Sequence, residues 1–243
     1  SITNISFYSN TAESYGGAIY FDVDDYGSIF RFEDNVLKEN YAGIHGGALY
    51  ADDDFGMQCL EGPYFNRNLF VGNVAGDDGG GAYLAEDFAD YCTGGEFVGN
   101  TFRLNQAGGD GGGAMIDEYV ADGGAVLFSS NVFTGNVAGG DGGGLYTSGI
   151  SYAADVEFVD NEMSDNVAAG DGGGLATYYS VVNEGGYLFM ARNKVERNIS
   201  GATGGGIAVG DDGYALVDDG GKLDFVDNII AGNKSQGYGA GMV

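Results

Sequence analysis

Large apolar side chains recur along the chain in a fixed relation to asparagine. Phe128 to Tyr146 reads FSSNVFTGNVAGGDGGGLY, and Phe158 to Ala176 reads FVDNEMSDNVAAGDGGGLA. The shared template is FxxNxFxxNxAxxDGGGLY, with a bulky apolar residue three places before each Asn. Units that begin at the first Asn recur every 30 to 35 residues, near Asn4, Asn35, Asn68, Asn100, Asn131, Asn161, Asn193 and Asn228. The chain is therefore one repeat, present about eight times, with the last copy truncated.

The period and the residue types predict short strands. An α-solenoid needs apolar residues at 3.6-residue spacing, whereas Gly triplets, Asn and aromatic or β-branched runs disfavour helix. A β-propeller blade needs about 40 residues with hairpin signals, and neither recurs. We therefore predict an all-β, single-stranded parallel β-helix over residues 1–243, a single segment of a longer chain, with about 31 residues per turn and seven to eight turns.

In such a coil, equivalent residues of successive turns stack about 4.8 Å apart. Phe128 and Phe158 should share one inward column. The second Asn of each unit should form a corner ladder that satisfies backbone groups, and Asn also tolerates left-handed backbone. Asn10 stands one step out of phase with this ladder. Its predicted members are Asn40, Asn73, Asn105, Asn136, Asn166, Asn198 and Asn233.

Glycine triplets close each unit and predict a tight corner, with positive φ or close backbone packing between coils. A phosphate-binding loop is the rival interpretation. It is disfavoured because a nucleotide loop occurs once, before a helix, with a Lys nearby. The triplets are Gly79 to Gly81, Gly111 to Gly113, Gly142 to Gly144, Gly172 to Gly174 and Gly204 to Gly206.

Four aspartates immediately precede these triplets and should form a file along the coil, which we call the aspartate file: Asp78, Asp110, Asp141 and Asp171. Like charges about 5 Å apart repel by about 0.8 kcal/mol in water and about 3 kcal/mol at an effective dielectric of 20. Screening, a raised pKa or a bound cation is expected, and an oxygen-only site suits Ca²⁺. The alternative is that Asp-Gly is simply a favourable turn. No other cofactor is required.

The two cysteines, Cys59 and Cys92, are 33 residues apart, which is one repeat. Stacked on neighbouring turns, their Cα atoms would lie within the separation that a disulfide accepts. We predict a Cys59–Cys92 disulfide, which would suit an oxidising, extracellular compartment. A pair of buried thiols is the alternative.

Composition limits the function classes. The chain has 36 acidic and 9 basic residues, a formal charge of −27, which repels nucleic acid and anionic membranes. Its 44% hydrophobic content, with 17 Tyr and 15 Phe, is too apolar for a Gly-rich linker despite 48 Gly. No stretch approaches the roughly 20 apolar residues of a membrane helix. The start has neither Met nor a signal pattern, so targeting and anchoring signals are expected elsewhere in a longer protein.

The motifs GGAI at Gly16 to Ile19, GGAL at Gly46 to Leu49, and the repeated FxxN resemble those of the polymorphic outer-membrane adhesins of chlamydiae. Similar repeats mark right-handed, pectin-lyase-like β-helices. The resemblance covers essentially the whole chain and implies a right-handed parallel β-helix with a surface-exposed, often adhesive role. The doubled FxxN per turn and the extreme acidity depart from the adhesin pattern.

Three functions follow as hypotheses. The first is an extracellular structural or adhesive rod, whose partners are other copies or flanking modules of a fibre, or surface glycans and proteins. The second is a polysaccharide lyase or hydrolase, and the third is a calcium-dependent carbohydrate-binding module. Asn4, Asn198 and Asn233 are candidate glycosylation sites, although modification of Asn198 and Asn233 conflicts with an inward ladder.

The enzyme hypothesis has weak support in the sequence. The only His, His45, occupies a repeat position held elsewhere by Asp, Tyr or Thr. The basic residues Arg192, Lys194 and Arg197 form the only basic cluster and suggest a solvated strand. An active site usually departs from the local rules of its scaffold, and no turn is expected to break the template to form a unique cleft. We therefore expect no catalytic residues.

Overall fold

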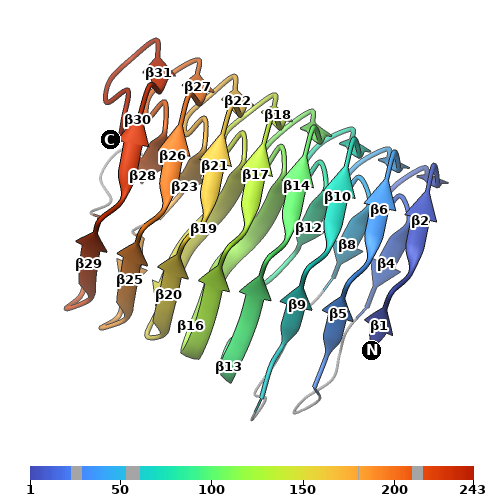
Figure 1. Cartoon of the computed structure of the whole chain (residues 1–243), viewed down its shortest axis with the longest axis horizontal. Coiled ribbons are helices and arrows are strands. Elements are labelled where there is room, and N and C mark those ends of the chain that lie inside the picture. Colours follow the sequence, from blue (N-terminus) through green and yellow to red (C-terminus); the bar gives the residue numbers. More distant parts are fainter. Residues whose placement is uncertain (23–28, 53–60, 180, 210–215) are drawn as a thin grey trace.

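The computed structural model describes the chain except residues 23–28, 53–60, 180 and 210–215. The described residues form an all-β parallel solenoid of about 7 turns, with about 32 residues per turn, as predicted (Figure 1). One turn runs through β5 (Arg31–Glu33), β6 (Val36–Lys38), β7 (Tyr41–Ala42) and β8 (Leu49–Ala51). No helix among the described residues is long and apolar enough to cross a membrane.

Each strand pairs in parallel with the equivalent strand of the next turn, so the turns form continuous sheets. The second strand of each unit belongs to an eight-stranded sheet of the described chain: β2 (Ser6–Tyr8), β6, β10 (Leu69–Val71), β14 (Thr101–Arg103), β17 (Val132–Thr134), β21 (Glu162–Ser164), β26 (Lys194–Glu196) and β30 (Ile229–Ala231). The third strand forms another: β3 (Thr11–Ala12), β7, β11 (Val74–Ala75), β15 (Gln106–Ala107), β18 (Val137–Ala138), β22 (Val167–Ala168), β27 (Ile199–Ser200) and β31 (Lys234–Ser235).

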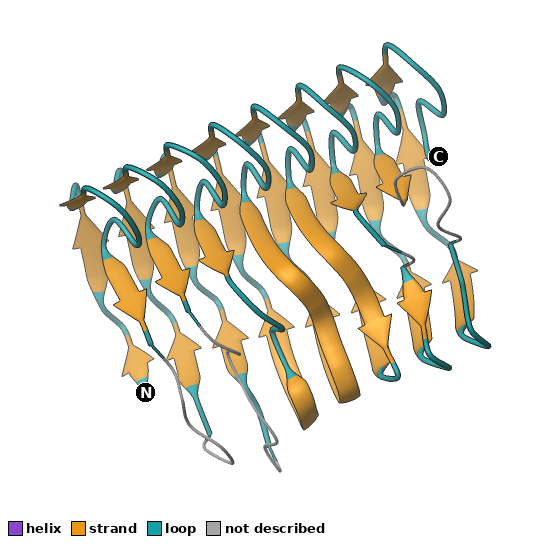
Figure 2. Ribbon diagram, turned by 180° about the vertical axis from the view of Figure 1, so that it is seen from behind, coloured by secondary structure: helices purple, strands orange, loops and turns teal. Residues whose placement is uncertain are grey.

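The first and last strands of each unit belong to one larger sheet. The first-strand row is β1 (Ile2–Thr3), β5, β9 (Tyr64–Asn66), β13 (Asp90–Val98), the end of β16 (Ala114–Ser129), β20 (Asp155–Val159), β25 (Tyr187–Ala191) and β29 (Lys222–Val226). The last-strand row is β4 (Ile19–Phe21), β8, β12 (Ala82–Leu84), the start of β16, β19 (Leu145–Tyr152), β23 (Leu175–Thr177) and β28 (Ile207–Val209), with β24 (Val182–Asn183) beside β19. The long strand β16 joins the two rows (Figure 2).

Stacked apolar rings fill the interior. Phe97, Phe128 and Phe158 occupy paired positions on β13, β16 and β20, so the predicted shared column is confirmed. Their ring centroids are 4.5 Å apart at each step, and the rings are nearly parallel. The parallel register places identical side chains over one another, and their burial removes large apolar surfaces from water. This core holds the strands together, because each turn is too small to bury its own apolar side chains.

The corners differ from the prediction in one respect. Left-handed backbone falls on the residue before each ladder Asn, as at Asp34 (φ 57°), Asp160 (φ 55°) and Arg197 (φ 57°), and not on the Asn itself. The Asn side chain must point inward to reach the neighbouring turns, so the preceding residue takes the bend and points to solvent.

The glycine corner uses both predicted features. Gly111 has φ +65°, and a Cβ at Gly112 would lie 2.5 Å from the backbone of Gly143 and of Val137 in the next coil. The first glycine therefore supplies the bend, and the second lets consecutive coils approach.

Candidate functional site

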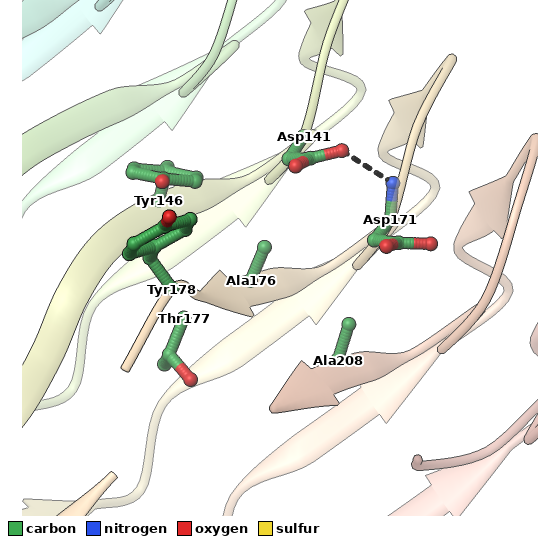
Figure 3. Close-up of a pocket in the computed structure, with 7 residues that line it drawn as sticks. All are labelled: Asp141, Tyr146, Asp171, Ala176, Thr177, Tyr178 and Ala208. Atoms are coloured by element: carbon green, nitrogen blue, oxygen red, sulfur yellow. Dashed lines mark hydrogen bonds between the residues drawn. The ribbon is translucent and has the colours of Figure 1, made fainter. Parts of the chain in front are cut away.

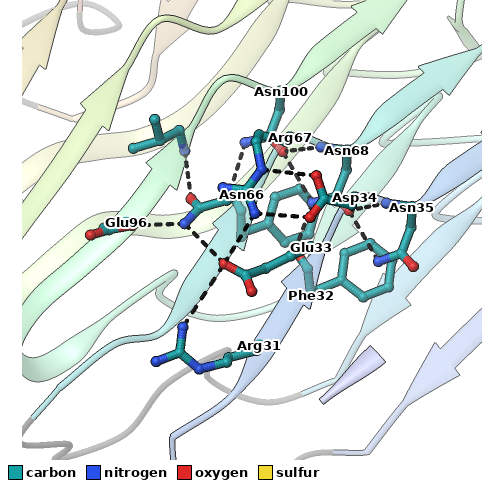
Figure 4. Close-up of polar contacts among 12 residues, drawn as sticks. Arg31, Phe32, Glu33, Asp34, Asn35, Asn66, Arg67, Asn68, Glu96 and Asn100 are labelled. Atoms are coloured by element: carbon teal, nitrogen blue, oxygen red, sulfur yellow. Dashed lines mark hydrogen bonds and ion pairs between the residues drawn. The ribbon is translucent and has the colours of Figure 1, made fainter. Parts of the chain in front are cut away.

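Two asparagine ladders run along the coil, one at each FxxN corner. In each step the carboxamide oxygen accepts the backbone N–H and the side-chain Nδ2–H of the preceding turn's Asn. Each Nδ2 also donates to a carbonyl of the turn before its own. Asn68 shows the pattern: its N and Nδ2 donate to Asn100 Oδ1 at 2.9 and 3.1 Å, and Nδ2 donates to Phe32 O at 2.7 Å (Figure 4). The ladder Asn residues from the second to the sixth turn are at most 2% exposed.

The first turn corrects the predicted phase. Asn10 lies in the second ladder, because its N and Nδ2 each donate to Asn40 Oδ1 at 2.9 Å. Asn4 is the residue displaced: Ile5 occupies the first-ladder position, and its N donates to Asn35 Oδ1. Asn4 (φ 57°) instead takes the left-handed place that precedes the ladder. The register between the first two turns is uniform, with Thr3 opposite Glu33 and Ser6 opposite Val36, so the first unit carries Ile5 where later units carry Asn.

The two candidate glycosylation sites in the second ladder are less accessible than the one at Asn4. Asn198 is fully buried, and its Nδ2 donates to Met163 O at 2.8 Å and to Asn233 Oδ1 at 3.1 Å. The Nδ2 of Asn233 donates to Val195 O at 2.7 Å. Asn4 is exposed. Glycosylation of Asn198 or Asn233 would break the hydrogen bonds of the ladder, whereas Asn4 can be reached without this loss.

Outward ion pairs lie beside the ladders. Arg67 forms a bidentate pair with Asp34, at 2.8 and 2.9 Å (Figure 4). In the same way, Arg192 pairs with Asp160 on the preceding turn. The guanidinium hydrogen bonds lower the pKa of Asp34 and of Asp160. Most of the basic cluster noted in the sequence is therefore engaged in surface pairs, which are worth little individually.

The aspartate file is a third ladder, and it runs through carboxylates. Asp78 Oδ1 accepts the N–H of Asp110 at 2.7 Å, and Asp110 Oδ1 accepts that of Asp141 at 2.6 Å. Asp141 Oδ1 likewise accepts the N–H of Asp171 at 2.6 Å, and Asp171 Oδ1 accepts both the N–H and the hydroxyl of Thr203. Backbone amides thus stabilise the file, and calcium binding there stays a prediction.

Burial is the main electrostatic effect on the first two carboxylates of the file. It raises the pKa of Asp78 and Asp110 above the ordinary value, against the lowering effect of the amide hydrogen bonds. His45 ends the file at Asp78: its Nδ1 accepts the N–H of Asp78 at 3.2 Å and lies 3.3 Å from Asp78 Oδ2. Because Nδ1 accepts this hydrogen bond, it carries a lone pair, and the approach to Oδ2 is not an ion pair in that tautomer.

Among the described residues, two clusters bring three potential metal-ligand atoms within 4.8 Å of one another. One is His45, Asp77 and Asp78, and it shares only Asp78 with the file. The other is Asp87, Asp90 and Asp122, which sequence reasoning missed because the three lie in the variable half of the repeat. Burial raises the pKa of Asp90 and Asp122. The oxygens of the second cluster are of the type that Ca²⁺ prefers.

The described part of the structure contains one of the two cysteines of the predicted disulfide. Cys92 is fully buried in the hydrophobic core. Cys59 lies outside the described residues, so the Cys59–Cys92 pair stays a prediction.

An outward column of tyrosines lies next to the aspartate file, and we call it the tyrosine column. Tyr50, Tyr83 and Tyr146 are only 8%, 6% and 8% exposed although they face away from the main core, because they pack in a separate small apolar cluster. The rings of Tyr50 and Tyr83 stack at 5.2 Å. Met115 continues the column between Tyr83 and Tyr146.

The tyrosine column ends at alanine. Ala176 and Ala208 occupy the next two positions after Tyr146, by strand register. They leave a recess of about 120 Å³ bounded by Tyr146, Tyr178, Thr177, Asp141 and Asp171 (Figure 3). The expectation that no turn would break the template is therefore wrong. The signal was present in the sequence, since GGGLY becomes GGGLA at Gly172 to Ala176.

A second hollow of about 420 Å³ lies over β13, β16 and β20 on another part of the surface. Acidic side chains line it at Glu96, Asp155 and Glu157. It has no aromatic wall.

Comparison with known proteins agrees with this architecture. The model of the Chlamydia polymorphic membrane protein repeat matches residues 4–22 and 132–148. Both segments run from an FxxN corner through the glycine corner, which are the parts of the repeat that form the ladders. No curated protein and no solved structure matches the chain. The chain is thus a parallel β-solenoid in which two segments match the Chlamydia polymorphic membrane protein repeat.

Proposed function

We propose that the chain is the rod of a surface-displayed, adhesin-like protein, in which stiffness and repeated outward chemistry are the function. The match to the Chlamydia polymorphic membrane protein repeat supports a surface location. The observation that carries the proposal is the unbroken parallel pairing: every FxxN corner from the first turn to the last joins its neighbour through the same two sheets. A solenoid of this kind presents an extended surface to partners.

The partners that we propose are surface proteins or glycans, and other copies or flanking modules of a fibre. The charge of −27 favours basic or neutral partners over nucleic acid and anionic lipid. Calcium is proposed as an accessory ion only.

We also propose that the chain is not an enzyme. His45 stacks in an aromatic column, with ring centroids 5.6 Å from Tyr15 and 4.8 Å from Tyr83. The file carboxylates accept backbone hydrogen bonds, a structural use of these groups. Both features support a structural interpretation of the residues that most resemble catalytic ones.

The test is adhesion of the folded rod. Beads coated with the chain should bind host-type cells, and beads coated with Phe128→Asp, whose buried charge disrupts the core column, should not. Electron microscopy should show stiff particles or filaments for the native chain alone. Equal adhesion of both bead types would argue against a function that depends on the rod.

The alternative functions have separate readouts. Cleavage of a polysaccharide, lost with Asp171→Asn, would establish a carbohydrate-active enzyme in place of the rod. Glycan binding that a chelator reverses would establish a calcium-dependent carbohydrate-binding module.

A further inference from the structure

The recess at the end of the tyrosine column is the one described place where the repeat's outward stack is interrupted beside the aspartate file. Tyr146 forms its aromatic wall, and Ala176 and Ala208 expose only methyl groups where two further large side chains would continue the stack. Tyr178 comes from the strand-end position two residues after Ala176 and lies beside Tyr146 (Figure 3).

The hydroxyl of Tyr146 differs from those of the other buried tyrosines in the column. Tyr50 donates to Asp52 at 3.0 Å, and Tyr83 donates to Asp117 of the next turn at 2.6 Å. For Tyr146 the equivalent next-turn residue is Tyr178. Its hydroxyl has no hydrogen-bond partner among the described residues, although the residue is only 8% exposed and lines the recess. The hydroxyl oxygen itself is open to solvent at the recess, so a ligand that enters the recess can reach it.

Two carboxylates form the remaining polar boundary of the recess. Backbone N–H groups fix Asp141 and Asp171 in position through the file hydrogen bonds, as the dashed contact in Figure 3 shows for this pair. None of the residues that line the recess is basic. The recess is therefore aromatic at one side, apolar at its floor and negative at its edge.

We propose that this recess binds the ammonium group of a lysine side chain presented by a partner protein. The ammonium carries three donors and a full charge, and the recess offers two carboxylates and the oxygen of the Tyr146 hydroxyl as acceptors. A cation close to a tyrosine face gains further attraction. The apolar stem of lysine would pack on the methyl groups of Ala176 and Ala208. The inference names a partner for the proposed adhesive rod and rests on that function.

A neutral sugar is a weaker match. It could stack on Tyr146, but it brings no positive charge to the acidic edge of the recess in a chain of charge −27. A metal ion is also a weaker match, because Asp141 and Asp171 do not belong to either described cluster with metal-ligand spacing.

The first experiment is a titration of the whole 243-residue chain by NMR, with selectively labelled alanine methyl groups. The probe is Nα-acetyl-lysine methylamide, and the matched control probe is the same compound with its ε-amine acetylated. We expect saturable shifts of the Ala176 and Ala208 methyl signals with the charged probe, and at least tenfold weaker binding of the acetylated probe.

The decisive variant is Ala176→Tyr, which fills the recess without changing charge. The backbone at Ala176 matches the backbone at Tyr146, which already accepts a tyrosine. A Cβ built at Gly142 would lie 2.7 Å from the Cβ of Tyr146, and a Cβ built at Gly172 would lie 2.7 Å from the Cβ of Ala176. We expect Ala176→Tyr to weaken lysine binding at least tenfold. Asp171→Asn, which keeps the acceptor for Thr203, should weaken it severalfold. Glu157→Gln, in the second hollow, removes one charge elsewhere and should change binding less than twofold.

Several results would overturn the inference. The first two are lysine binding that survives Ala176→Tyr and equal binding of the acetylated probe. The third is an equal loss of binding with Glu157→Gln, which would mean only diffuse charge attraction. The fourth is a shift of the methyl signals caused by glucose but not by lysine. Bead adhesion distinguishes failure of the lysine site from failure of the rod function. Adhesion that persists with Ala176→Tyr in a chain that binds no lysine would overturn the lysine site alone, whereas loss of adhesion in the native chain would overturn the rod.

Discussion

The side-chain amide of Asn105 donates to the carboxamide oxygen of Asn136 at 3.1 Å, and the backbone N–H of Asn105 donates to the same oxygen at 3.0 Å. The same Nδ2 reaches Phe70 O at 3.1 Å, so one side chain links three successive turns. Such a residue satisfies backbone groups that the tight corner would otherwise leave buried without partners. The ladder is therefore a structural counterpart of the phenylalanine column, and both depend on the register between turns.

Asn105→Ala should be strongly destabilising. It leaves the buried backbone N–H of Asn73 without an acceptor, removes one of the two hydrogen bonds of Asn73 Nδ2, and removes the Asn105 donor from Phe70 O. We expect a loss of roughly 3 kcal/mol in the free energy of unfolding, measured by chemical denaturation. The neighbouring exposed Gln106→Ala is the control and should change stability by about 0.5 kcal/mol or less. Similar losses for both variants would contradict the importance of the ladder.

Phe128→Ala should create a cavity in the centre of the core. The ring stacks at 4.5 Å on both Phe97 and Phe158, so the neighbouring turns cannot collapse to fill the gap. We expect a cost of about 3–5 kcal/mol, read from the denaturation midpoint. Phe128→Met should cost much less, because Met190 already occupies the same column. An equally large effect of both substitutions would show that the aromatic volume is not the cause.

Asp110→Asn should stabilise the chain at pH 7. Burial raises the pKa of this carboxyl in the folded state above its ordinary value of 3.8. At a pH between 3.8 and the raised pKa, the folded chain therefore holds more protons than the unfolded chain. Stability therefore falls as the pH rises through this window. The amide keeps the oxygen that accepts the N–H of Asp141, and removing the charge should raise the free energy of unfolding by roughly 1 kcal/mol at pH 7.

The pH dependence gives a control of opposite sign. The Arg67 hydrogen bonds lower the pKa of Asp34, so this carboxylate stabilises the fold above about pH 4 and loses that contribution as the pH falls. Melting temperatures between pH 4 and 7 should rise on acidification more in the native chain than in Asp110→Asn. Asp34→Asn should not raise stability at pH 7. If Asp110→Asn lowers stability at pH 7, the file carboxylate is net stabilising and the prediction is wrong.

The cysteine prediction is tested by mass. Cys92 is fully buried, so labelling is done after unfolding in denaturant without reductant. A Cys59–Cys92 disulfide should leave no thiol to alkylate, and prior reduction should expose two and lower the melting temperature. A closed loop of this size contributes about 3–4 kcal/mol by the chain-entropy estimate. Two alkylated thiols without reductant would refute the bond.

The sequence by itself determined the coil. Apolar residues at a fixed offset from Asn, repeated about every 31 residues, allow only an arrangement in which Phe128 lies over Phe97 and under Phe158, because any other register would bury polar positions. The sequence also determined the tight corner at Gly112, because a side chain at this position would clash with the backbone of Gly143. Repetition supplies this information many times, so a single irregular turn does not obscure it.

Only the tertiary structure decided how the corners and the outer face are used. Asn10 joins the second ladder whereas Asn4 does not join the first, because the strand register places Ile5, and not Asn4, opposite Asn35. The burial of Tyr146 outside the main core, and the recess beside Ala176, arise from contacts among the last-strand row of adjacent turns, Tyr178 and the aspartate file. Such contacts depend on the angle at which two segments meet, and residue spacing along the chain does not encode that angle directly.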